Sequence, residues 1–318
     1  MKKSVFAIIA AVAVVMVSSC QKNEPENKVN GVRLTIEATM EKAIETKTTY
    51  AEVGTPAAIS AEWEGAEAIT VVSLGEDGIT AVDEFTYSGA AGKTASFTGT
   101  WNGQAGDKVI CLYPAITTKA GAALYSNVTV GSSTIDFTYP AHAPVSQIAD
   151  LKDWDAMVGT VTIGGSTASA SLKRQIAVFR IGFSGGYFDS PDFHYVDQIG
   201  IYALDSSSKP VLFGKAGTIA ATKATFTGSI VPTAYQEEYC LTITPGLTKE
   251  GTYVYYYPVF ADGSLNTGDK IQVKTYERER WGYNGSTDRY NDYVSRTLKS
   301  QIAIRPGYVY TIPEIGLW

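Results

Sequence analysis

The sequence has few of the side chains on which catalytic and metal sites depend. It contains two histidines and three cysteines in 318 residues, and neither His142 nor His194 has a carboxylate or cysteine at metal-ligand spacing. Motifs for a nucleophile elbow, a zincin helix, a phosphate loop or a dinucleotide fold are absent. We expect the acidic group Asp150, Asp153 and Asp155 to lie in solvated turns. The chain is therefore expected to be no enzyme and to need no cofactor or metal, with a hydrolase built from distant carboxylates kept as a third alternative.

Excess positive charge and a disulfide framework are also missing. The 26 Lys and Arg residues against 32 Asp and Glu residues give a formal charge of -6, which provides no basic field for nucleic acid. Besides Cys20 the chain has only Cys111 and Cys240, which we expect at equivalent positions of different domains and not to pair. No stretch shows a convincing amphipathic helix. Abundant Gly, Tyr, Thr and Val instead favour strands and tight turns.

The first twenty residues predict export. Lys2 and Lys3 precede an apolar run from Val5 to Val17, which is shorter than the about 20 residues of a membrane-spanning helix. Ser18 and Ser19 leave room for a peptidase before Cys20, whose thiol is a candidate for acyl chains such as palmitate. We interpret residues 1–20 as a lipoprotein signal peptide and 21–30 as a flexible tether, which predicts a lipoprotein precursor of the outer membrane. An ordinary secretory signal with an incidental cysteine is the alternative.

The rest of the chain predicts an all-β fold. Apolar residues at Val32, Leu34, Ile36, Ala38 and Met40 alternate strictly with polar ones, the pattern of a strand with one buried face. Short runs bounded by turn residues continue from there, which is typical of an antiparallel sandwich or barrel.

The second half of the chain repeats features of the first. Three correspondences occur in order at an offset of 129 to 130 residues, and they predict a duplicated strand unit. We place the domains at 31–171 and 172–318. The matched segments are Ala68–Leu74 with Gln198–Leu204, Lys93–Gly99 with Lys223–Gly228, and Cys111 with Cys240.

One aromatic cluster, interleaved with charged residues, suits a sugar ring or a protein partner, because its rings give contact area with polar neighbours. A long hairpin whose rings pack on the sheet is the simpler interpretation. The cluster comprises Trp281, Tyr283, Tyr290 and Tyr293.

Several short motifs together resemble the fimbrillin-like lipoproteins of Bacteroidales, the subunits of type V pili. They span nearly the whole chain, although each is loose alone. The motifs are Ser18-Ser19-Cys20, the strand Arg33 to Met40, Thr46-Lys47-Thr48, Trp63 to Ile69, Phe97 to Trp101, Leu112-Tyr113-Pro114 and Pro306 to Ile312.

The resemblance implies two tandem antiparallel transthyretin-like β-sandwiches and a structural pilin subunit, of shaft or tip, in an adhesive cell-surface fimbria. It further implies that a protease removes the first strand with its lipid and that a neighbouring subunit fills the gap by strand exchange. The protease that the resemblance implies is trypsin-like or arginine-specific. The loop after the first strand contains lysine but no arginine, so Lys47 and Lys42 are the candidate cut sites.

The carboxyl-terminal strand is a candidate donor for that gap, through Tyr308, Tyr310, Ile312, Ile315 and Leu317; completion of its own domain is the alternative. The expected partners are other pilin subunits, in a homopolymer or a tip assembly, the outer membrane before processing, and a host protein or glycan. Two alternatives remain open: a surface glycan-binding lipoprotein and a membrane-held pilus anchor.

Overall fold

Strands account for nearly all regular structure in the computed structural model of the chain, which is all-β. No α-helix occurs among the residues that the structure describes. The described residues are 31–40, 51–53, 58–60, 62–65, 67–116, 127–138, 151, 154–185, 194–212, 214–226, 228–235, 239–247, 251–260, 263–281 and 286–317. In this part of the chain nothing helical is both long and apolar enough to pass through a bilayer.

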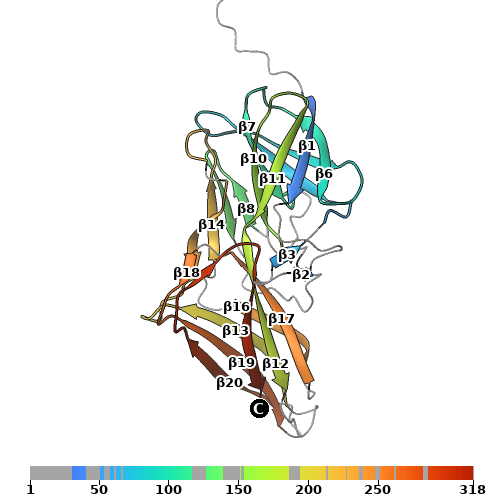
Figure 1. Ribbon diagram of the computed structural model, residues 1–318. Coiled ribbons are helices and arrows are strands. Elements are labelled where there is room, and N and C mark those ends of the chain that lie inside the picture. The colour runs from blue at the N-terminus through green and yellow to red at the C-terminus, as the bar shows by residue number, and fades with distance from the viewer. Residues whose placement is uncertain are drawn as a thin grey trace, which may run out of the picture. The chain divides into compact units, whose positions relative to one another are not determined.

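Seven strands from the first half close into a barrel (Figure 1). Its sequence alternates as a barrel requires: β11 has every second residue buried along its whole length. Around the barrel the strands follow the order β1 (Val32–Met40), β11 (Thr167–Arg174), β10 (Met157–Thr162), β7 (Lys108–Tyr113), β4 (Ala68–Leu74), β5 (Ile79–Tyr87) and β6 (Thr94–Trp101).

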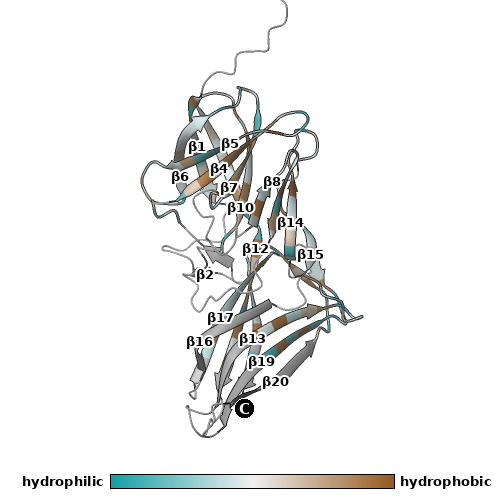
Figure 2. Ribbon diagram, turned by 180° about the vertical axis from the view of Figure 1, so that it is seen from behind, coloured by the Kyte–Doolittle hydropathy of each residue, from teal (hydrophilic) through white to brown (hydrophobic). Residues whose placement is uncertain are grey.

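The closed barrel takes the place of the first of the two sandwiches that we expected. Closure depends on β1, which pairs with β6 along one edge and with β11 along the other. Strands β5 and β6 complete the ring with two register pairs, Thr86↔Thr98 and Tyr87↔Phe97. The apolar residues of β4 and β7 line this barrel and appear brown in Figure 2.

The second half forms two open sheets. The first has the order β17 (Gly251–Phe260), β12 (Ile176–Gly185) and β22 (Val309–Leu317). The second has the order β16 (Tyr239–Leu247), β13 (His194–Leu204), β19 (Lys270–Trp281) and β20 (Ser286–Thr297). Strand β22 runs parallel to β12 at an edge of its sheet, so this carboxyl-terminal strand is seated within its own chain.

A four-stranded sheet takes strands from both halves, which a division into two separate sandwiches does not anticipate. Its order is β15 (Val231–Tyr235), β14 (Gly214–Ala220), β9 (Thr134–Thr138) and β8 (Asn127–Val130). Two small two-stranded sheets pair β18 (Gly263–Leu265) with β21 (Ile302–Ile304), and β2 (Ala51–Val53) with β3 (Ala58–Ser60).

The boundary expected between residues 171 and 172 falls inside a strand. Leu172 and Arg174 continue the alternation of β11 and face the barrel. The chain leaves the barrel at Gln175, after which β12 begins at Ile176. The apolar pattern runs through this point because both strands bury residues, so the sequence does not mark the turn between them.

The predicted duplication holds for one strand pair. Strand β4 pairs with β7 at Val71↔Cys111, and β13 pairs with β16 at the nearly equivalent Gly200↔Cys240. The correspondence between Lys93–Gly99 and Lys223–Gly228 fails. Residues 93–99 lie mostly on β6, whereas the described residues of 223–228 lie in turns that precede β15.

Candidate functional site: strand β1 and the slot that it fills

Strand β1 is hydrogen-bonded along both of its edges. It runs antiparallel to β6 from Val32↔Trp101 to Thr39↔Thr94, and parallel to β11 from Thr35↔Thr167 to Met40↔Leu172. The Thr35 N–H also donates to the Ser166 carbonyl at 3.0 Å. We call the space between β6 and β11 the β1 slot.

The inner face of β1 belongs to the barrel core. Leu34, Ile36 and Ala38 are fully buried and Met40 nearly so. Val32, predicted to face inward with them, is instead 42% exposed at the start of the strand. Three large side chains are therefore buried, worth about 5–9 kcal/mol in total at about 1.5–3 kcal/mol each.

The outer face of β1 is polar and makes hydroxyl contacts with its neighbours. Thr39 Oγ1 lies 3.0 Å from Thr94 Oγ1 across the pair with β6. On the side of β11, Ser169 Oγ donates to Glu37 Oε2 at 3.5 Å. Cross-strand contacts of this kind add tenths of a kcal/mol, so the inner face dominates the retention of β1.

A buried ion pair lies at the carboxyl end of the slot. Arg174 Nε donates to Asp155 Oδ2 at 2.8 Å, and the two side chains are 5% and 0% exposed. Arg174 Nη2 also lies 3.9 Å from Met40 Sδ. Met40 therefore helps to cover this pair. Asp155 does not lie in a solvated turn as we expected, because the fold brings it against Arg174 in the core.

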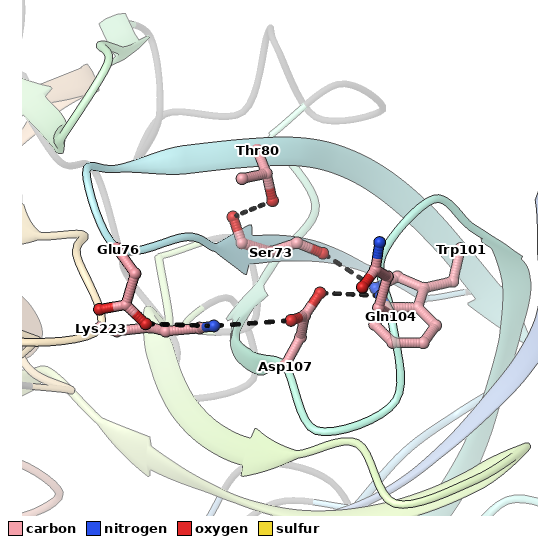
Figure 3. Close-up of polar contacts among 7 residues, drawn as sticks. All are labelled: Ser73, Glu76, Thr80, Trp101, Gln104, Asp107 and Lys223. Carbon is pink, nitrogen blue, oxygen red and sulfur yellow. Dashed lines mark hydrogen bonds and ion pairs between the residues drawn. The ribbon is translucent and has the colours of Figure 1, made fainter. Parts of the chain in front are cut away.

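The amino-terminal end of the slot adjoins a polar network. Trp101, which pairs with Val32, donates from Nε1 to Ser73 Oγ at 2.9 Å. Nearby, Lys223 Nζ lies between two carboxylates, 3.6 Å from Glu76 Oε1 and 3.8 Å from Asp107 Oδ1 (Figure 3). The bond from Trp101 to Ser73 joins the end of β6 to β4.

Aromatic rings pack inside the barrel next to the slot. Trp63 meets both Phe97 and Tyr113 edge-on, with ring centroids 5.0 Å apart in each case. Phe97 is also the register partner of Ile36. Trp63 Nε1 is buried and has no hydrogen-bond partner among the described residues, so the contacts that the structure shows for this ring are packing contacts.

The other predicted site residues fall into two groups. Cys20, Lys42 and Lys47 lie outside the described residues. The candidate donor residues lie at β22: Tyr308 is half-buried just before the strand, and Ile312 is buried within it. Ile315 and Leu317 are described by their backbone only.

Tyr310 holds the start of β22 in place. Its hydroxyl accepts from the Arg305 N–H at 2.7 Å and donates to the Ala303 carbonyl at 3.1 Å. Its ring packs on Phe179 of β12, with centroids 5.7 Å apart. Detaching β22 as a donor therefore breaks these contacts as well as its pairing with β12.

The aromatic cluster lies on the hairpin of β19 and β20. Trp281 pairs with Ser286, Glu277 with Tyr290 and Lys274 with Tyr293. Trp281, Tyr290 and Tyr293 are described by their backbone only, and Tyr283 lies outside the described residues. The aromatic contact site therefore stays a prediction.

Two residues of the slot were missed at the level of sequence. No role was predicted for Arg174, and Trp63 served only as part of a loose motif. No local pattern signals either role, because each depends on a neighbour distant in sequence. Within the described residues, no three His, Cys, Asp or Glu side chains gather as a metal site would require.

Solved structures with a similar arrangement come from Bacteroides and Parabacteroides. A protein of Bacteroides ovatus provisionally described as an adhesin aligns with a TM-score of 0.44 and 9% identity, over 95% of this chain and 98% of its own. Another protein of B. ovatus, provisionally described as a cell adhesion protein, gives 0.42 and 12%, over 90% and 92%. One of B. eggerthii with the same description gives 0.40 and 15%, over 92% and 88%. No protein-family model and no curated protein matches the sequence. Likeness at this level does not establish a family or a function.

Proposed function

We propose that this chain is a structural subunit of an adhesive cell-surface fimbria, of the fimbrillin-like kind, that reaches the outer membrane as a lipoprotein acylated at Cys20. A protease cuts after β1, at Lys47 or Lys42, and releases the strand with its lipid. A strand of a neighbouring subunit then fills the β1 slot. The role is structural and involves no catalysis.

The observation that carries this proposal is the position of β1 in both sequence and fold. It is the first strand among the residues that the structure describes, so a single cut between Met40 and Ala51 separates it covalently from every later described strand. It is also the strand that joins β6 to β11 and closes the barrel. Its loss leaves two unpaired edges and an apolar gap, and such a gap favours the addition of a strand from another chain.

Without the cut, β1 stays in place. Both edges are paired and about 5–9 kcal/mol of apolar burial holds the inner face, which is comparable to the whole stability of a typical domain. Proteolysis therefore acts as the step that commits a subunit to assembly. A subunit that is not cut keeps its lipid and serves as a membrane-held anchor.

The test uses a lysine-specific protease on the purified protein. We expect loss of the residues up to Lys47, after which an added peptide with the sequence of residues 32–40 should bind the cut protein and co-elute with it on size-exclusion chromatography. A variant with Lys42→Gln and Lys47→Gln is the matched control, and it should remain intact at β1 and bind no peptide. Fully cut protein that binds no strand peptide would contradict the proposal. Mass analysis of the protein from intact cells reports the lipid and the cut site directly.

A second candidate function is glycan binding, which the presence of Trp281, Tyr290 and Tyr293 on the paired strands β19 and β20 favours, since aromatic residues with polar neighbours suit a sugar. Glycan-array binding should then be lost in Trp281→Ala. An array on which the unaltered protein binds nothing removes this candidate.

A further inference from the structure

The inward side chains of β1 follow a fixed order of sizes. Read along the strand they are Leu34, Ile36, Ala38 and Met40, all buried. The order is large, large, small, large. It is not symmetric, so a strand that enters the slot in the reverse direction brings its side chains to different positions.

The walls of the slot match this order at its amino-terminal end. Leu34 pairs with Gly99 of β6. A Cβ at Gly99 would lie 2.5 Å from Phe85 Cδ1, so the Phe85 ring occupies the space that a side chain at this position would take. Ile36 lies between Phe97 and Ala168. Leu34 and Ile36 therefore each have one small neighbour in the wall.

The third position is restricted differently. Ala38 lies between Ala95 and Ala170, and all three are buried, at 0%, 2% and 3% exposure. Interiors are packed at crystal-like density, so the volume in front of these three methyl groups is filled by other core side chains. A larger residue at this position overfills the core.

The carboxyl-terminal strand of the chain does not fit these four positions. Pro313 and Glu314 are adjacent, so every seven-residue register drawn from residues 308–318 turns one of them inward, in either direction. Proline cannot donate a hydrogen bond in a strand that is paired on both edges. An inward Glu314 buries a carboxylate. The one register that brings Glu314 to Arg174 also places Ile312 at the Ala38 position.

We propose that the β1 slot selects a strand with inward residues in the order large, large, small, large and without proline, supplied by a subunit other than a second copy of this chain. Ala38 marks the position that sets the register and direction of the incoming strand. The inference rests on the strand replacement proposed above, and it adds that assembly at this slot is heterotypic. Strand β22 then stays paired with β12 in its own chain.

The test measures strand exchange with peptides. A site-specific protease sequence is inserted after Lys47 in the full chain, and the cut is verified by mass spectrometry. Exchange of a fluorescent peptide of residues 32–40 is followed by polarisation, with unlabelled peptides as competitors. These are the native sequence, its Ala38→Leu variant, its Ile36→Val variant as the matched control, and residues 308–318.

We expect the native and Ile36→Val peptides to compete within a few-fold of each other. The Ala38→Leu peptide and the 308–318 peptide should each compete at least tenfold more weakly. Equal competition by Ala38→Leu would overturn the size selection, and strong competition by 308–318 would identify a second copy as the occupant. If no peptide enters the verified, cut protein, strand replacement itself fails.

Discussion

At the scale of single residues, burial decides the chemistry of the charged and nucleophilic groups. Asp155 and Arg174 form an ion pair with almost no exposure. Such a pair is weak grounds for high stability, because removing both charges from water costs about as much as their attraction returns. Breaking it is a different matter, since one charge then remains buried without its partner.

Replacing Asp155 by alanine should therefore lower the free energy of unfolding by about 3–5 kcal/mol, because the Arg174 guanidinium stays buried. Chemical denaturation measures this loss. The double variant Asp155→Ala with Arg174→Met should lose less than the single variant, since no charge remains in the core. A loss below about 1 kcal/mol in the single variant would show that water reaches Arg174.

Cys111 should be inert in the folded protein. Burial raises the pKa of its thiol to about 12, and the reactive thiolate is the deprotonated form. At pH 8, below that pKa, the thiol stays protonated and out of contact with reagent. We expect no alkylation of Cys111 by iodoacetamide in native protein and complete alkylation in denaturant, as followed by peptide mapping. Modification at equal rates in both conditions would contradict the buried position.

At the scale of elements, β1 shows what the sequence can predict. Its bounds and its buried face follow from strict alternation, because the side chains of a strand point to opposite faces in turn. The pattern failed only at Val32, where the barrel wall ends and solvent reaches the side chain. Alternation does not reveal which strands pair with β1. The neighbours β6 and β11 place Ala95 and Ala170 beside Ala38.

The two ends of this pattern give a matched pair of substitutions. Ile36→Ala should lower the free energy of unfolding by about 2–5 kcal/mol, because it leaves a cavity beside Phe97. Val32→Ala removes a half-exposed side chain of the same strand and should change the free energy of unfolding by less than about 0.5 kcal/mol. Denaturation curves of the two variants compare them directly. Similar losses would mean that the inner face of β1 is not part of the core.

At the scale of the whole molecule, the two halves of the chain are built differently. The first closes into a barrel, while the second has open sheets whose edge strands have no further partner among the described strands. Strands from both halves share the sheet of β15, β14, β9 and β8. Lys223, from a turn in the second half, adds contacts to Glu76 and Asp107 of the barrel loops.

Lys223 should contribute little to stability, and its contribution should depend on salt. Glu76 is 79% exposed, so the pair is largely solvated. Lys223→Ala should cost at most about 1 kcal/mol at low ionic strength. The cost should shrink in about 1 M salt, where charges are screened within about 3 Å. Thermal unfolding at both salt concentrations tests this, and a large loss that is independent of salt would point to packing by the lysine stem.

The sequence by itself determined that the chain is all-β, that a strand spans Val32–Met40, and which face of that strand is buried. These properties are local, because alternation with a period of two is written into neighbouring residues. Only the tertiary structure decided that β1 closes a barrel, that β11 continues to Arg174, and that Asp155 is buried. Those outcomes depend on pairing between strands far apart in the chain, and a local pattern carries no record of the partner.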